Sequence, residues 1–101
     1  MGRRAKVVWA APALDDLDEI VAFIALDDRR AAAALARKTI NAVDRLRQNP
    51  DSGRWVPEVI GKIYREIIVG PCRVIYRREG AGVLIVHVVR SERMLRGHRL
   101  I

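Results

Sequence analysis

The sequence has a single cysteine, Cys72, and few aromatic side chains: two Trp, two Tyr and one Phe among 101 residues. One cysteine excludes an internal disulfide and a cysteine-rich metal cluster. Because aromatic side chains are so few, the core must be mainly aliphatic. We expect neither a bound metal nor a cofactor. We interpret Cys72 as a small buried apolar residue and not as a reactive thiol, because no activating partner for a thiol can be named.

Long uncharged segments are also missing. Arg3, Arg4 and Lys6 precede an uncharged run over 7–14, as in a signal peptide, but Pro12 and the acidic residues after it break that pattern. No uncharged run reaches the roughly 18 residues of a membrane span. The sequence therefore predicts a soluble, cytoplasmic protein, and its length predicts a single domain over residues 1–101.

The charge is unevenly distributed along the chain. The formal net charge is +7, and residues 1–53 carry nine Lys/Arg and eight Asp/Glu, whereas residues 54–101 carry ten and four. The C-terminal half therefore holds most of the excess positive charge. This asymmetry favours an acidic or polyanionic partner for that half, and a merely solvated basic surface is the alternative.

The N-terminal half predicts a strand followed by a helical hairpin. Residues 6–9 are β-branched and aromatic enough for a strand, and Pro12 suits the first turn of a helix over 12–26. The apolar face of this helix comprises Leu14, Leu17, Ile20, Val21 and Ile24. Asp27 or Asp28 can cap a second helix, which ends at the turn 49–53. Its apolar stripe comprises Ala32, Leu35, Ala36, Thr39, Ile40, Val43 and Leu46.

The C-terminal half predicts three strands in succession, over 63–69, 72–78 and 83–89, with glycine-containing turns between them. The last is apolar except at His87, so we place it between the first strand and the strand over 72–78. The predicted fold is a two-layer α+β domain of order β-α-α-β-β-β, in which the N-terminal strand joins a mainly antiparallel four-stranded sheet and the helical hairpin packs on it.

Five arginines come from these three strands or lie just past their ends: Arg65, Arg73, Arg77, Arg90 and Arg93. We predict that they form one basic partner-binding patch, and separate solvated charges are the alternative. Strand alternation places Arg65 on an apolar face, which requires either a bulge or an arginine that faces a site. Trp55, in the preceding loop, either stacks on a partner or covers the edge of the core.

Five segments, read in order, resemble the RelE/ParE toxin superfamily. They are PALDDLDEI at 12–20, NPDSGR at 49–54, Arg65-Glu66 in a strand, GPCRVIYR at 70–77 and VVRSER at 88–93. The resemblance covers nearly the whole chain, from about residue 7 to residue 95. Cys72 departs from the pattern, since an aromatic residue is commoner before that arginine. The resemblance implies the same fold and a type II toxin of the ParE-like kind, neutralised by a cognate ParD-like antitoxin.

The superfamily divides into two activities. The resemblance implies either a RelE-like endoribonuclease, which cuts messenger RNA on the ribosome, or a ParE-like inhibitor of DNA gyrase. Members that cut RNA place a tyrosine, or a histidine and a tyrosine, at or after the last strand beside sheet arginines. Here the last tyrosine is Tyr76, so the acid-base set is incomplete. The sequence therefore favours a non-enzymatic gyrase inhibitor.

The endoribonuclease alternative would use Arg73, Arg90 and either His87 or His98. His87 is a proton carrier in that hypothesis. We favour the other interpretation, a hydrogen-bonded histidine in the core or at an interface. A third hypothesis is an inactive module that only binds its antitoxin.

Overall fold

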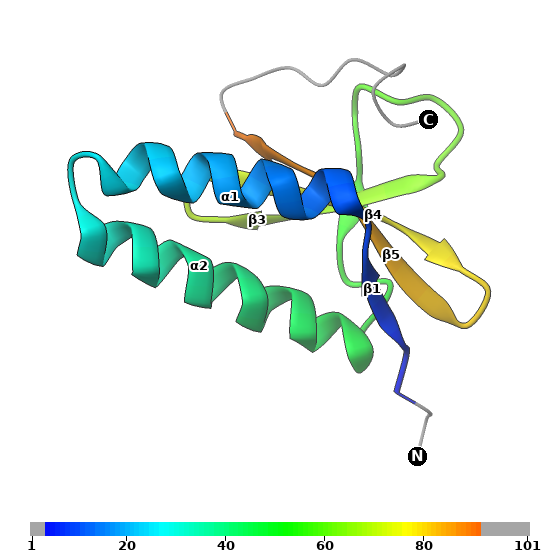
Figure 1. The fold of residues 1–101 in the computed structure, drawn as a ribbon. Helices are drawn as coiled ribbons and strands as arrows, with labels where there is room; N and C mark the ends of the chain where they lie inside the picture. The colour runs from blue at the N-terminus through cyan, green and yellow to red at the C-terminus, as the bar shows by residue number, and fades with distance from the viewer. Residues whose placement is uncertain (1–3, 92–101) are drawn as a thin grey trace.

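The computed structural model describes residues 4–91, and Figure 1 shows its helices packed on the sheet. The elements are β1 (Val7–Trp9), α1 (Ala11–Ala25), α2 (Arg29–Asp44), the 3-10 turn η1 (Arg45–Arg47), β2 (Arg54–Trp55), β3 (Tyr64–Val69), β4 (Cys72–Glu79) and β5 (Gly82–Arg90). The strand order is β1-β5-β4-β3-β2, with β1 parallel to β5 and the other neighbours antiparallel. The predicted α+β fold and the central place of the last strand are confirmed.

The predicted strand count is wrong by one. Trp55 lies in β2 and not in a loop, because Arg54 and Trp55 pair with Glu66 and Arg65 of β3. Two residues are too few to show the alternation by which a strand is recognised in a sequence. This short edge strand extends the sheet to five strands.

Both helices begin near the predicted residues. Pro12 lies in the first turn of α1, and the carboxylate of Asp28 accepts the backbone N–H of Ala31 at 3.0 Å, so Asp28 is the cap of α2. Two predicted core positions are wrong, since Leu14 and Ile40 are exposed. Ala13 and Ala42 are buried instead, and their small side chains let the helices pack closely. None of the described helices is long and apolar enough to span a membrane.

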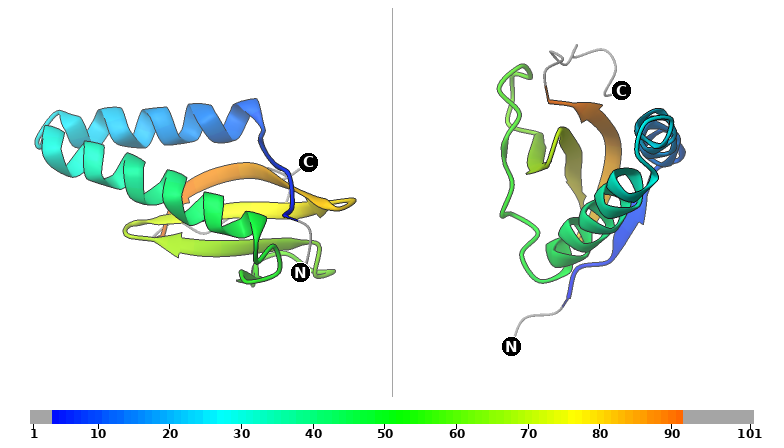
Figure 2. Two further views of the ribbon diagram at one scale, coloured as in Figure 1. Left: turned by 90° about the horizontal axis from the view of Figure 1, so that it is seen from below. Right: turned by 90° about the vertical axis from the view of Figure 1, so that its left-hand side faces the viewer.

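The main core lies between the helices and the sheet, and a smaller cluster lies on the opposite face of the sheet. This second cluster is built on Val56, Ile75 and Val86. Val56 belongs to the connection between β2 and β3, which Figure 2 shows on the side of the sheet away from the helices. The connection covers part of a sheet face that the helices leave uncovered.

A β-bulge in β5 lets one strand serve both clusters. Tyr76 pairs with Ile85 and Ile75 pairs with His87, so Val86 is the extra residue of β5. Ile85 and Val88 can therefore both pack in the main core, while Val86 packs in the second cluster.

Strand alternation places Arg65 on an apolar face of β3. A bulge in β3 does not explain this position, because the register of β3 with β4 is continuous. Arg65 pairs with the core residue Tyr76 and so lies on the helix-bearing face. Its Nη1 donates to the carbonyl oxygen of Gly53 at 2.8 Å, and its guanidinium lies 3.8 Å from the centre of the Trp55 ring. Arg65 and Trp55 therefore cover this edge of the core together.

Tyr76 ties the turn before β2 to the core. It is fully buried, and its hydroxyl accepts the backbone N–H of Gly53 at 2.9 Å. Burial raises the pKa of Tyr76 above its ordinary value of 10.0, and the N–H of Gly53 partly opposes that rise. The neutral hydroxyl is therefore the form that the fold accommodates.

Replacing Tyr76 by Phe should lower the free energy of unfolding by about 1–2 kcal/mol near neutral pH, because a buried N–H loses its acceptor. The folded pKa is raised, so this stabilisation is complete below pH 10 and is lost as the pH rises through the folded pKa. Urea unfolding at pH 8 and at pH 11 measures both effects. The gap between wild type and variant should narrow at the higher pH, and a gap that widened would contradict the assignment.

Candidate functional site

Four charged side chains meet on the sheet face that carries the second cluster. Glu66 of β3 pairs with Ile75, a member of that cluster, and Arg54 of β2 pairs with Glu66. Arg73 of β4 pairs with Val89, which also packs against the cluster. Glu58 comes from the connection between β2 and β3. Strand register thus brings three of the four together, and a loop supplies the last.

Arg73 is the centre of this group. Its two terminal nitrogens donate to the two carboxylate oxygens of Glu58, each at 2.7 Å, and its Nε donates to Glu66 at 2.7 Å. The hydrogen bonds that Arg73 donates to Glu58, and then those that it donates to Glu66, raise the pKa of Arg73, although burial acts in the opposite direction. The side chain of Glu66 is 0% exposed and also accepts a hydrogen bond from Nε of Arg54. We call these four residues the Arg73 cluster.

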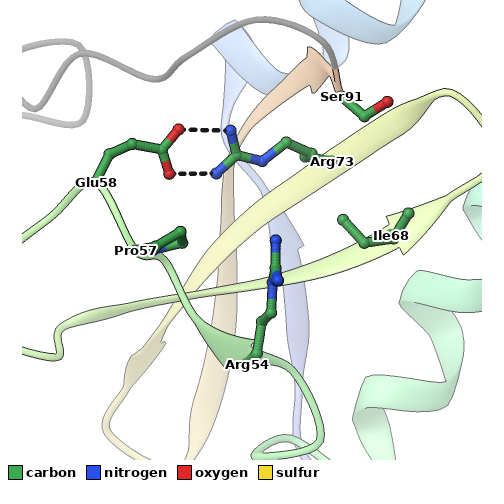
Figure 3. A pocket seen from close by; sticks show the side chains of 6 residues that line it. All are labelled: Arg54, Pro57, Glu58, Ile68, Arg73 and Ser91. Carbon is green, nitrogen blue, oxygen red and sulfur yellow. Dashed lines mark hydrogen bonds and ion pairs between the residues drawn. The ribbon is translucent and has the colours of Figure 1, made fainter.

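An open pocket of about 480 Å³ lies beside the cluster, as Figure 3 shows. Its lining residues are Arg54, Pro57, Glu58, Ile68, Arg73 and Ser91. The side chain of Arg54 is 64% exposed, whereas that of Arg73 is 6% exposed. A guanidinium next to apolar surface is suited to bind an anion, but the lining residues among 4–91 include no histidine or tyrosine to transfer a proton. Among residues 4–91 no group of His, Cys, Asp and Glu could hold a metal ion.

The four described arginines of the predicted basic patch are not brought together. Arg65 lies on the helix-bearing face, and Arg73 is buried between two glutamates. Arg77 donates to the Tyr64 hydroxyl at 3.3 Å and to Glu79 at 3.1 Å, while the Arg90 guanidinium lies 5.0 Å from the centre of the Phe23 ring in α1. Arg93 and His98 lie outside the described residues. A role of these arginines, or of Trp55, in partner binding stays a prediction.

His87 makes a contact that agrees with a hydrogen-bonded histidine. Its Nδ1 lies 3.0 Å from Oδ2 of Asp16 in α1, and the same oxygen accepts the backbone N–H of Val88 at 3.0 Å. β1 pairs with residues 83–85 of β5 and does not reach Val88. Asp16 therefore accepts the backbone N–H that β5 presents beyond the end of β1. Of the other candidates for chemistry, Cys72 is buried as predicted, and the burial of Tyr76 removes it as an acid-base group.

Replacing Asp16 by Ala should lower the free energy of unfolding by about 1–2 kcal/mol, because the Val88 N–H and His87 lose an acceptor. Asp15 is exposed in the same turn, so Asp15→Ala removes an equal charge and should stay within about 0.5 kcal/mol of wild type. Chemical unfolding of both variants checks this. Equal effects would mean that helix charge, and not the contact with β5, determines the loss.

Sequence reasoning missed Arg54, Glu58, Glu66 and Asp16. In the sequence a buried glutamate such as Glu66 cannot be distinguished from a solvated one without the register that places Arg54 and Arg73 beside it. Asp16 is one of four acids near the start of α1. Nothing in their spacing indicates which one faces the sheet.

Three comparisons place the fold among known proteins. A family model described as the ParE toxin of the type II toxin-antitoxin system parDE matches residues 7–95. A protein of Sinorhizobium fredii named "Putative toxin Y4kP" is 45% identical over 51 residues, which are 50% of this chain and 53% of that relative. A solved structure of the chromosomal ParDE system from P. aeruginosa superposes with a TM-score of 0.73 at 24% identity, covering 90% of this chain and 100% of the other.

Proposed function

Because the chain belongs to the ParE toxin family of type II toxin-antitoxin systems, we propose that it inhibits DNA gyrase by protein contact, without chemistry of its own. We further propose that it acts in the cytoplasm and that a cognate ParD-like antitoxin neutralises it. The match of the family model over 7–95 is the observation that supports the proposal most strongly.

The candidate catalytic residues also favour a toxin without nuclease activity. An endoribonuclease would need Arg73 at the crowded phosphate of its substrate, but the fully buried Glu66 pairs with that guanidinium and offsets its charge. It would also need a tyrosine or histidine beside it, and of the candidates among residues 4–91 Tyr76 is buried in the main core while His87 pairs with Asp16. His98 lies outside those residues. These contacts support inhibition by binding over RNA cleavage.

Two assays test the proposal. Expression without the antitoxin should arrest growth and block replication, and the purified protein should inhibit supercoiling by gyrase in a dose-dependent way. Coexpression of the neighbouring open reading frame should restore growth. The proposal fails if gyrase keeps full activity while induced cells lose messenger RNA at once, and primer extension on ribosome-bound message would then identify the cleavage. If expression does not arrest growth, the hypothesis that remains is an inactive module that only binds its antitoxin.

We expect the antitoxin to carry an acidic and amphipathic segment, since residues 54–101 hold most of the net positive charge. Charge of this kind accelerates association more than it strengthens the complex. Raising salt from low to physiological concentration should therefore slow association about tenfold or more and leave dissociation nearly unchanged. Stopped-flow mixing of the two purified proteins measures both rates. If the association rate does not change with salt, the positive charge of residues 54–101 serves binding to the target and not to the antitoxin.

A further inference from the structure

Glu58 binds Arg73 as a ligand would. Two parallel N–H groups of the guanidinium donate to the two oxygens of one carboxylate, which is the geometry by which arginine recognises carboxylates in other molecules. Figure 3 shows the pair at the side of the pocket, with Arg54 and Ile68 nearby. Glu58, however, belongs to no strand or helix.

The charges of the Arg73 cluster show what removal of Glu58 would leave. The cluster contains two guanidinium groups and two carboxylates. Glu66 is fixed in the middle of β3 and fully buried, so it stays with both arginines. Without Glu58, two positive charges share one carboxylate beside the pocket, and a single negative group is needed to restore the balance.

The segment that carries Glu58 is anchored near its start and exposed further along. Val56 is buried and Val59 is partly buried against the second cluster, but Ile60 and Ile63 are exposed. Lys62 has a φ of 52°, a left-handed conformation that costs a residue with a side chain about 1 kcal/mol or more. The later part of this connection is therefore exposed, and moving Glu58 away from Arg73 breaks no pairing between β3 and β4.

We propose that the pocket is a recognition site for a carboxylate on an acidic and apolar segment of a protein partner, and that Glu58 occupies it as an internal ligand which the partner displaces. The site belongs to this chain whether or not gyrase is the target. It gives the connection between β2 and β3 a role as a gate over the pocket.

The lining favours a protein segment over a nucleic acid. Arg54 is the exposed cation of the lining, and Pro57 and Ile68 offer apolar surface next to it. A nucleic-acid backbone is bound by rows of exposed cations. A glutamate or aspartate flanked by apolar side chains fits one buried arginine and two apolar residues better.

The test uses the sequence of the gate itself as the probe. The blocked peptide Val-Pro-Glu-Val-Ile repeats residues 56–60, and a second peptide has Gln in place of Glu. Both are titrated into the Glu58→Ala protein and wild type, with binding followed by NMR chemical shifts. The variant should bind the Glu peptide about tenfold or more tightly than the Gln peptide, and about tenfold or more tightly than wild type does, because a charged hydrogen-bonded pair is gained.

Glu79→Ala is the matched control. It removes an acid that pairs with Arg77 away from the pocket lining, so its net charge equals that of Glu58→Ala. It should bind the peptide no better than wild type. Arg54→Met in the Glu58→Ala background should weaken binding again. If Glu58→Ala does not fold, Glu58→Gln takes its place with the same peptides.

Three results would overturn the proposal. Equal affinity of the Glu and Gln peptides for the Glu58 variant would exclude carboxylate recognition. If the Glu79→Ala protein bound the Glu peptide as tightly as the Glu58 variant does, the effect would come from net charge alone. Displacement of the peptide by equimolar inorganic phosphate at constant ionic strength would make the pocket a general anion site and not one for a protein segment.

Discussion

Replacing Arg73 by Met should lower the free energy of unfolding by about 3–5 kcal/mol, because it leaves Glu66 buried with only one arginine and Glu58 with none from the cluster. This is a large part of the stability of a domain of this size. Urea unfolding at neutral pH measures it. Arg78→Met is the control, since Arg78 is partly exposed and pairs with the exposed Asp51, and it should cost less than about 1 kcal/mol.

A combined variant separates uncompensated charge from lost packing. Glu58→Gln and Glu66→Gln, added to Arg73→Met, remove both carboxylates that the first substitution leaves behind. Most of the lost stability should return, because amides cost less to bury than charges. A triple variant as unstable as Arg73→Met alone would show that shape, and not charge, makes the cluster necessary. Arg73 would then support the sheet only by filling space.

Substitution of Gly53 should have the next largest effect. A Cβ at this position would lie 2.6 Å from the Tyr76 hydroxyl and 2.7 Å from the backbone oxygen of Glu66. Neither atom can move easily, because Tyr76 is in the main core and Glu66 is in the middle of the sheet. Gly53→Val should therefore cost about 3 kcal/mol or more, and Gly53→Ala somewhat less.

Calorimetric unfolding of this graded series checks the expectation. Gly53→Ala in a Tyr76→Phe background should cost less than in wild type, since the nearest clashing atom is gone. Gly80 is a control for backbone effects, because a Cβ there meets no atom within 4 Å although its φ is +58°. If Gly53 and Gly80 tolerated alanine equally, close approach would not be the reason that glycine stands at 53.

The fold was predictable where periodicity extends over many residues. The apolar stripes that contain Leu17 and Leu35 predicted the two helices. The apolar run over 83–89 predicted that β5 lies inside the sheet, between β1 and β4. β2 was missed because two residues carry no period. The buried faces of the helices were partly misassigned because small residues such as Ala13 and Ala42 carry little hydrophobic signal.

The candidate site was much less predictable than the fold. The sequence predicts Arg73 in a basic partner-binding patch, or in a nuclease site as the alternative, yet its contacts are with Glu58 and Glu66. These partners lie 15 and 7 residues away along the chain, and only strand register and the course of a loop bring them together. A charged residue in a sequence is assumed to be solvated, so its burial with a partner is visible only in three dimensions.

The order of the strands has a consequence for folding. β1 comes first in the chain but pairs with β5, through Val7 with Val83 and Trp9 with Ile85. Nascent chains that lack residues 82–90 have no partner for β1, and α1 lacks the strand on which it packs in the sheet. Such long-range pairings slow folding and delay the closure of the core until synthesis has passed β5. A ribosome stalled before residue 82 would therefore carry a chain whose two amphipathic helices face a sheet that lacks both β5 and the paired β1.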